Sequence, residues 1–160
     1  MSGETVFIPL KFEFPNVKLV DVLRAYKTKM EERSQQKGIV TVVNISKQSS
    51  NYMIYSIERK LPDWAIRFFN LNHIEYKEHA KIIDNNSIEI TSGHTVGNIT
   101  MNMHINHIYD PNSKSTMTTA FAKASHVPKI LRKLLEGYIK KEFLNERKAE
   151  LTFAKNISVQ

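Results

Sequence analysis

The most regular pattern in the chain is an alternation of apolar and polar residues over 98–109, NITMNMHINHIY. Every second residue from Ile99 to Ile105, including Met101 and Met103, is apolar, and the residues between them are polar. Successive side chains of a β-strand point to opposite faces, so this segment is predicted to be a strand with one buried face. Less regular segments of the same kind predict further strands at 4–14, 39–46, 52–60, 73–84, 87–93 and 115–126.

Two long segments repeat apolar residues at helical spacing, from Val17 to about Glu32 and from Pro128 to about Asn156. A short aromatic segment at 61–70, LPDWAIRFFN, is predicted to be a helical insert between two strands. Short turns join most of the strands, which indicates antiparallel pairing and an α+β fold. We therefore expect one domain over 1–160, in which a curved antiparallel sheet grips the long C-terminal helix around an apolar cavity.

The C-terminal helix carries an unusual inward face. Glu142 and Glu146 fall within its apolar stripe, where carboxylates are costly unless they are paired or solvated. Lys141, Lys148 and Lys155 follow one another at intervals of seven residues along one flank. This arrangement could hold a ligand with apolar tails and an anionic head. The alternative is a core-packed helix with a solvated basic edge.

Aromatic and basic residues gather in and before the 61–70 insert, where Trp64, Phe68 and Phe69 follow Arg59 and Lys60. Such a segment suits either a membrane-interface anchor or a lid, because aromatic rings favour the headgroup level and cations favour anionic lipids. The alternative is a small helix that plugs one end of the core.

Methionine side chains adapt to loosely fitting apolar ligands, although they also pack in ordinary cores. If the cavity exists, we expect the alternating strand and the C-terminal helix to line it. The residues predicted to line it are Met101, Met103, Leu135 and Tyr138.

The amino-acid composition restricts the classes of function that this protein could have. The net charge of +7 favours an anionic partner, which could be a nucleic acid, a lipid head group or an acidic protein. The absence of cysteine excludes disulfides and thiolate metal sites. The histidine spacing does not predict a metal site, and no spacing of acids or serines indicates an enzyme, so we expect no cofactor. Basic residues are not interleaved with aromatic ones along a strand, so no nucleic-acid partner is expected.

Three stretches resemble a known family. Phe14-Pro15 precedes a predicted helix that contains Arg24-Ala25, the run Arg59-Lys60-Leu61-Pro62-Asp63-Trp64 is similar to a Lys-Leu-Pro-x-Trp motif, and a lysine-rich helix spans Val127 to Lys155. Together they resemble the PRELI-like mitochondrial lipid-transfer proteins of the START-like helix-grip superfamily. The family's Tyr-Pro-Asn-Pro after the first helix is replaced by Met30-Glu31-Glu32-Arg33.

The resemblance implies a non-enzymatic carrier of phosphatidic acid or phosphatidylserine in the mitochondrial intermembrane space. It also implies membrane contact and a small helical partner with twin Cys-x9-Cys motifs. The implied head-group ligands are Lys29, Lys60, Lys141 and Lys148, the last two to within one residue. The implied lid and membrane contacts are Leu61, Trp64, Phe68 and Phe69. The alternatives are a START-like domain that binds another hydrophobic ligand or scaffolds a protein, a basic nucleic-acid-binding module, and a cytoplasmic location.

Overall fold

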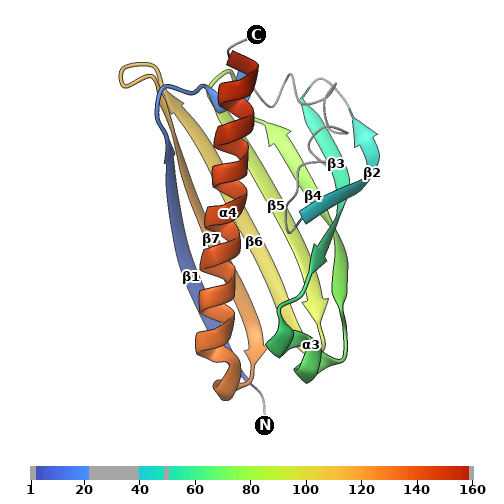
Figure 1. The fold of residues 1–160 in the computed structure, drawn as a ribbon. Helices are drawn as coiled ribbons and strands as arrows, with labels where there is room; N and C mark the ends of the chain where they lie inside the picture. Colours follow the sequence, from blue (N-terminus) through green and yellow to red (C-terminus); the bar gives the residue numbers. More distant parts are fainter. Residues whose placement is uncertain (1–2, 22–39, 49–50, 159–160) are drawn as a thin grey trace.

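The computed structural model describes residues 3–21, 40–48 and 51–158. In this part of the chain, seven strands form one antiparallel sheet in the order β1-β7-β6-β5-β4-β3-β2 (Figure 1). The strands are β1 (Glu4–Phe14), β2 (Val40–Gln48), β3 (Tyr52–Lys60), β4 (His73–Ile82), β5 (Ser87–Val96), β6 (Ile99–Asp110) and β7 (Ser115–Val127). The helices are α3 (Asp63–Phe69), the 3-10 turn η2 (Lys129–Leu131) and α4 (Arg132–Ser158).

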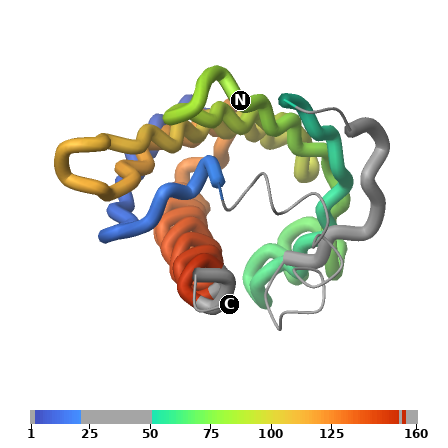
Figure 2. Tube along the Cα trace, turned by 90° about the horizontal axis from the view of Figure 1, so that it is seen from above, coloured from blue at the N-terminus to red at the C-terminus, as the bar shows by residue number. Residues whose placement is uncertain are grey.

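The sheet is strongly curved, and α4 runs along its concave face. Seen from above, the strands form an arc around the helix (Figure 2). The first strand, β1, closes the arc on one side by pairing with β7 over most of its length, with Phe7 opposite Lys123 and Phe14 opposite Thr116. Helix α3 lies at the end of the molecule where α4 begins (Figure 1).

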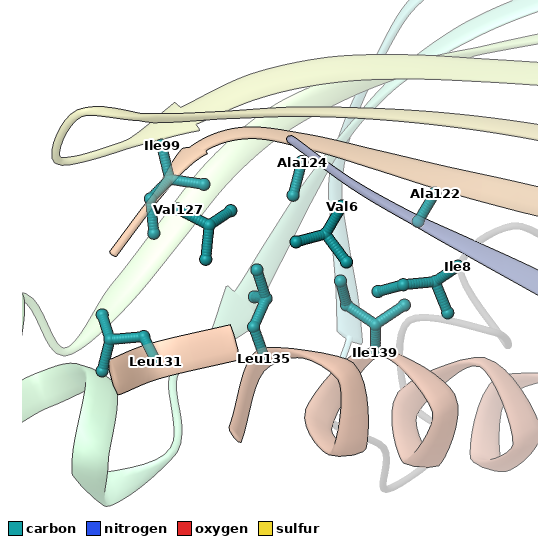
Figure 3. Close-up of a cluster of buried hydrophobic side chains, with 9 residues drawn as sticks. All are labelled: Val6, Ile8, Ile99, Ala122, Ala124, Val127, Leu131, Leu135 and Ile139. Atoms are coloured by element: carbon teal, nitrogen blue, oxygen red, sulfur yellow. The ribbon is translucent and has the colours of Figure 1, made fainter. Parts of the chain in front are cut away.

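Helix α4 packs against one half of the sheet. The inward side chains of β7 include Ala122 and Ala124, which are fully buried and small enough for a helix to approach the strand closely. Leu135 and Ile139 of α4 fill this contact (Figure 3). The same cluster contains Val6, Ile8, Ile99, Val127 and Leu131. Burial against β1 and β7 therefore holds the first half of the helix to that side of the sheet.

The predicted fold class is confirmed. Each predicted strand is present, with ends that differ by a few residues. Strand β5 continues to Val96 because its last residues pair with Thr100 and Ile99 across a tight turn. The predicted insert is α3, and the C-terminal helix begins after Pro128 as expected. Of the helix predicted from Val17 to Glu32, residues 17–18 are not helical, residues 19–21 are helical, and residues 22–32 lie outside the described residues. No described helix is long and apolar enough to cross a membrane.

Candidate functional site

A cavity of about 880 Å³, part of which is open to solvent, lies between the concave sheet, α3 and α4. Its wall is mainly apolar. The apolar lining consists of Leu61, Trp64, Ala65, Phe69, Ile74, Val96, Ile99, Met101, Met103, Ile105, Leu135, Ile139 and Phe143. A predominantly apolar lining with a few polar groups is typical of small-molecule sites.

Helix α3 forms one end of the cavity. It starts after Pro62, which is pre-organised for a helix start, and ends at Asn70, which has the left-handed conformation that closes many helices. Its Trp64 ring meets the Tyr138 ring of α4 edge-on, with the centroids 6.3 Å apart. Its Phe69 ring packs against Gly97, whose φ of +60° and missing side chain permit the contact, since a Cβ there would lie 2.7 Å from the ring. These contacts hold the helix against both the sheet and α4.

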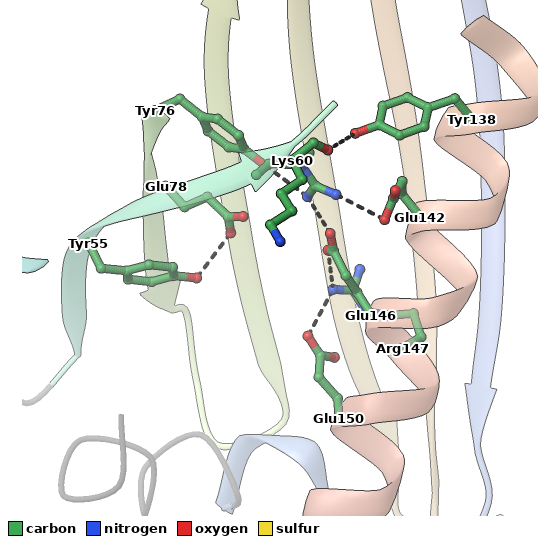
Figure 4. A network of polar contacts seen from close by, with 10 residues as sticks. Tyr55, Lys60, Tyr76, Glu78, Tyr138, Glu142, Glu146, Arg147 and Glu150 are labelled. Atoms are coloured by element: carbon green, nitrogen blue, oxygen red, sulfur yellow. Dashed lines mark hydrogen bonds and ion pairs between the residues drawn. The ribbon is translucent and has the colours of Figure 1, made fainter. Parts of the chain in front are cut away.

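A buried polar network occupies one wall of the cavity (Figure 4). Its centre is Arg59, the last inward-facing residue of β3. The Arg59 Nη1 atom lies 3.4 Å from Glu142 of α4, and the Nη2 atom donates to Glu146. The Nε and Nη2 atoms also donate to the Tyr76 hydroxyl, at 3.1 and 2.9 Å. The two carboxylates in the apolar stripe of α4 are thus paired by a cation from the opposite wall.

The network continues along α4. Arg147 lies 3.3 Å from Glu146 and 2.8 Å from Glu150, and its guanidinium stacks over the Phe143 ring at 4.9 Å. The side chains of Arg147 and Glu150 are almost fully buried. Because a desolvated charge is tolerated only when it is paired and hydrogen-bonded, the residues of this chain of ion pairs depend on one another.

Burial in this wall displaces several pKa values. It raises the pKa of Glu142, against the opposing effect of Arg59, and it raises the pKa of Tyr138 to about 12. It also raises the pKa of the Tyr76 hydroxyl. The pKa of His94 is lowered to about 4, mainly by burial and to a smaller extent by the nearby positive charge of Arg59. The His94 ring stacks on the Tyr76 ring, with the centroids 4.3 Å apart. His94 is therefore neutral at physiological pH and adds no positive charge to the wall.

The three predicted head-group lysines that the structure describes are not part of the cavity wall. Lys60, Lys141 and Lys148 are exposed, and none of them lines the cavity. The physical reason for Lys60 is strand alternation, which turns Arg59 inward and its neighbour outward. On α4, Lys141 precedes the inward Glu142 by one residue, which is a rotation of about 100° on a helix. Lys29 lies outside the described residues.

The predicted lid and cavity residues are placed differently from the lysines. Apart from Phe68, all of them contribute to the cavity wall, namely Leu61, Trp64, Phe69, Met101, Met103, Leu135 and Tyr138. Phe68 points away from the cavity and is 49% exposed. The segment 61–70 therefore both encloses the cavity and presents an aromatic ring to the outside.

The sequence pattern did not reveal the central cation or its aromatic partners. It places Arg59 beside the insert rather than inside the cavity, and it does not single out Tyr76, His94 or Arg147. A signal existed for Arg59, since it continues the inward series of Tyr55 and Ile57 on β3. Among the described residues, no group of three or more His, Asp or Glu side chains could hold a metal ion.

No protein-family model matches this chain, and no curated protein matches it by sequence. Solved structures do match. The protein TTHA0849 from Thermus thermophilus has a TM-score of 0.67 at 9% identity, over 96% of this chain and 99% of that one. This chain has the START/Bet v1-like helix-grip fold.

Two further structures show the same fold. The ZhuI aromatase/cyclase from Streptomyces sp. R1128 has a TM-score of 0.62 at 10% identity, over 95% of this chain and 94% of that one. Human STARD10 has a TM-score of 0.58 at 9% identity, over 92% of this chain and 62% of that one. Identities this low establish the fold alone, and the PRELI-like family remains a hypothesis from the sequence.

Proposed function

We propose that this protein is a non-enzymatic carrier, which binds a hydrophobic molecule in its cavity and exchanges it at a membrane surface. The observation that carries the proposal is the apolar cavity closed by the sheet, α3 and α4. Each methylene group withdrawn from water into such a site contributes about 0.8 kcal/mol. A chain of about twelve methylenes would gain roughly 10 kcal/mol, more than an open surface groove could supply.

The end of the molecule that carries α3 and the start of α4 suits a membrane surface. Ile130 is 78% exposed, and Phe68, Leu134 and Leu71 are each more than 40% exposed. Exposed cations on the same segments are Lys60, Arg67, Lys129 and Lys133. Apolar side chains that can enter the interface, surrounded by cations that attract anionic lipids, favour reversible docking. Docking at this end would bring the α3 side of the cavity to the membrane.

The more specific hypothesis follows from the sequence resemblance. In it, the ligand is phosphatidic acid or phosphatidylserine, the location is the mitochondrial intermembrane space, and a twin Cys-x9-Cys protein is the partner. The exposed positions of Lys60 and Lys141 modify this hypothesis, because a phosphate bound by them would lie outside the cavity while the acyl chains lie inside it.

Native mass spectrometry of the purified protein, followed by extraction of any bound molecule, tests the carrier proposal. We expect one hydrophobic molecule per chain. Met101→Trp places a larger ring in the cavity wall and should reduce the occupancy several-fold. Ile108→Trp is the matched control, because Ile108 lies on the opposite face of the same strand and is 52% exposed. A protein that is empty, and that also takes up no lipid from vesicles, would contradict the proposal.

A catalytic role is the second candidate. Neutral His94, Tyr138 and Glu142 line the cavity with displaced pKa values, a combination that is frequent in active sites. The same experiment separates the two functions. A carrier returns its ligand unchanged after prolonged incubation, whereas an enzyme returns a molecule of altered mass or structure.

A further inference from the structure

The charges on the cavity wall restrict the polar group of the ligand. Arg59 is the single cation in a trio whose other members, Glu142 and Glu146, are both carboxylates. Their side chains are only 11%, 11% and 16% exposed, so water screens them weakly. Glu146 joins the trio to Arg147 and Glu150, and this network of two arginines and three carboxylates carries one net negative charge when all three carboxylates are ionised.

The hydrogen bonds of the Arg59 guanidinium are also unevenly distributed among its partners. The Nε and Nη2 atoms of Arg59 are engaged by Tyr76, and Nη2 additionally by Glu146. Within the described part of the chain, Glu142 accepts only from Nη1, at a long 3.4 Å. Glu142 is thus the less tightly held carboxylate of the trio, and it lines the cavity, as do Met103 and Leu135.

An anionic ligand group would meet unfavourable surroundings here. It would have to compete with Glu142 and Glu146 for Arg59 and with Glu146 and Glu150 for Arg147, and His94 offers it no charge. The buried Nδ1 atom of His94 has no hydrogen-bond partner among the described residues, so it could form a hydrogen bond with a ligand. A cationic group beside Glu142 would instead balance the three carboxylates of the network with three cations, and charge-assisted hydrogen bonds are the stronger kind.

We propose that the ligand is a hydrophobic amine, whose ammonium group pairs with Glu142 while its aliphatic part lies along the apolar wall. The inference rests on the proposed function, because it requires the cavity to take up a hydrophobic molecule. It departs from the anionic-phospholipid hypothesis and makes the opposite prediction about charge preference.

Three ligands of equal chain length test it: tetradecylamine, tetradecanol and tetradecanoate. Their dissociation constants can be measured at pH 7.4 by displacement of the neutral dye Nile red, below the concentrations at which the ligands aggregate. We expect the amine to bind at least about tenfold more tightly than the carboxylate, with the alcohol between them. Glu142→Gln should weaken amine binding about tenfold and change alcohol binding less than twofold. The control Glu75→Gln, at an exposed position of β4, should change neither.

The possible outcomes test the amine inference and the carrier proposal separately. Binding of the carboxylate as tightly as the amine, or more tightly, would overturn the amine inference and leave the carrier proposal standing. Equal weakening of all three ligands by Glu142→Gln would overturn the assignment to Glu142. Failure of the wild-type protein to bind Nile red or any of the three ligands would overturn the carrier proposal itself.

Discussion

Replacing Arg59 with Met should strongly destabilise the protein. Methionine reaches as far as the Nε position of arginine and replaces its aliphatic stem, so the substitution mainly removes the guanidinium with its charge and its hydrogen-bond donors. It removes the cation that pairs with Glu142, leaves Glu146 with Arg147 as its described partner, and leaves the Tyr76 hydroxyl without the guanidinium that donates to it.

The expected loss is set by the uncompensated carboxylate of Glu142. Removing one partner of a buried ion pair typically costs about 3–5 kcal/mol, whereas replacing a whole buried ionic group by apolar residues is often neutral or stabilising. We therefore expect Arg59→Met to lower the free energy of unfolding by about 3–5 kcal/mol. The triple variant Arg59→Met, Glu142→Met, Glu146→Met should return to within about 1 kcal/mol of wild type, because Arg147 keeps Glu150 at 2.8 Å.

Urea unfolding followed by circular dichroism measures both variants, at pH 7.4 and at pH 5.5. In the single variant the Glu142 carboxyl group loses the cation that opposes the effect of burial, so its pKa in the folded state should be raised further. A raised pKa makes the stability contribution of a group largest at low pH and smaller as the pH rises, so the deficit should shrink at pH 5.5. A loss below about 1 kcal/mol for Arg59→Met, or a triple variant as unstable as the single one, would refute the argument.

Two further predictions address the membrane end and the buried histidine. Phe68→Glu combined with Ile130→Glu should weaken binding to anionic vesicles, measured by co-sedimentation, at least about tenfold, because burying each apolar side chain contributes about 1.5–3 kcal/mol. The control is Phe7→Glu, at a 63% exposed position on β1, which should have little effect on this binding. His94 has a lowered pKa of about 4, so its contribution to stability is present above the ordinary histidine pKa and is lost as the pH falls toward 4. Between pH 7 and pH 4.5 the free energy of unfolding of the wild type should therefore fall by about 2–3 kcal/mol more than that of His94→Phe, at about 1.36 kcal/mol per pKa unit. Equal losses of the two proteins in urea unfolding would contradict the lowered pKa of His94.

The fold could be predicted from the sequence because its local signals are strong. The alternation from Ile99 to Ile105 marks β6, and the helical repeat after Pro128 marks α4. Hairpin connections left few ways to arrange the strands. The cavity itself followed from a simple requirement, because a curved sheet and one helix cannot contact each other over the whole concave face.

The site was harder to predict because its partners are distant in sequence. Glu142 and Glu146 were recognised as costly inward carboxylates, but their partner Arg59 lies 83 and 87 residues away. Only the register of β3 decides that Arg59 rather than Lys60 points inward. The resemblance selected lysines as a class of head-group ligands, and the strand and helix geometry turned those in the described part outward.

The ion-pair network explains how an apolar cavity can coexist with a stable fold. On the β1 and β7 side, alanines let α4 pack directly on the sheet. On the other side, Phe143 and Ala154 of α4 belong to buried clusters with residues of β3 to β6, and Arg59 also joins β3 to α4 across the cavity wall. A polar link holds two walls at a fixed separation without filling the space between them, whereas apolar packing would close it. The same network thus joins the two walls of the cavity, and under the amine proposal it also sets which charge a ligand can bring into it.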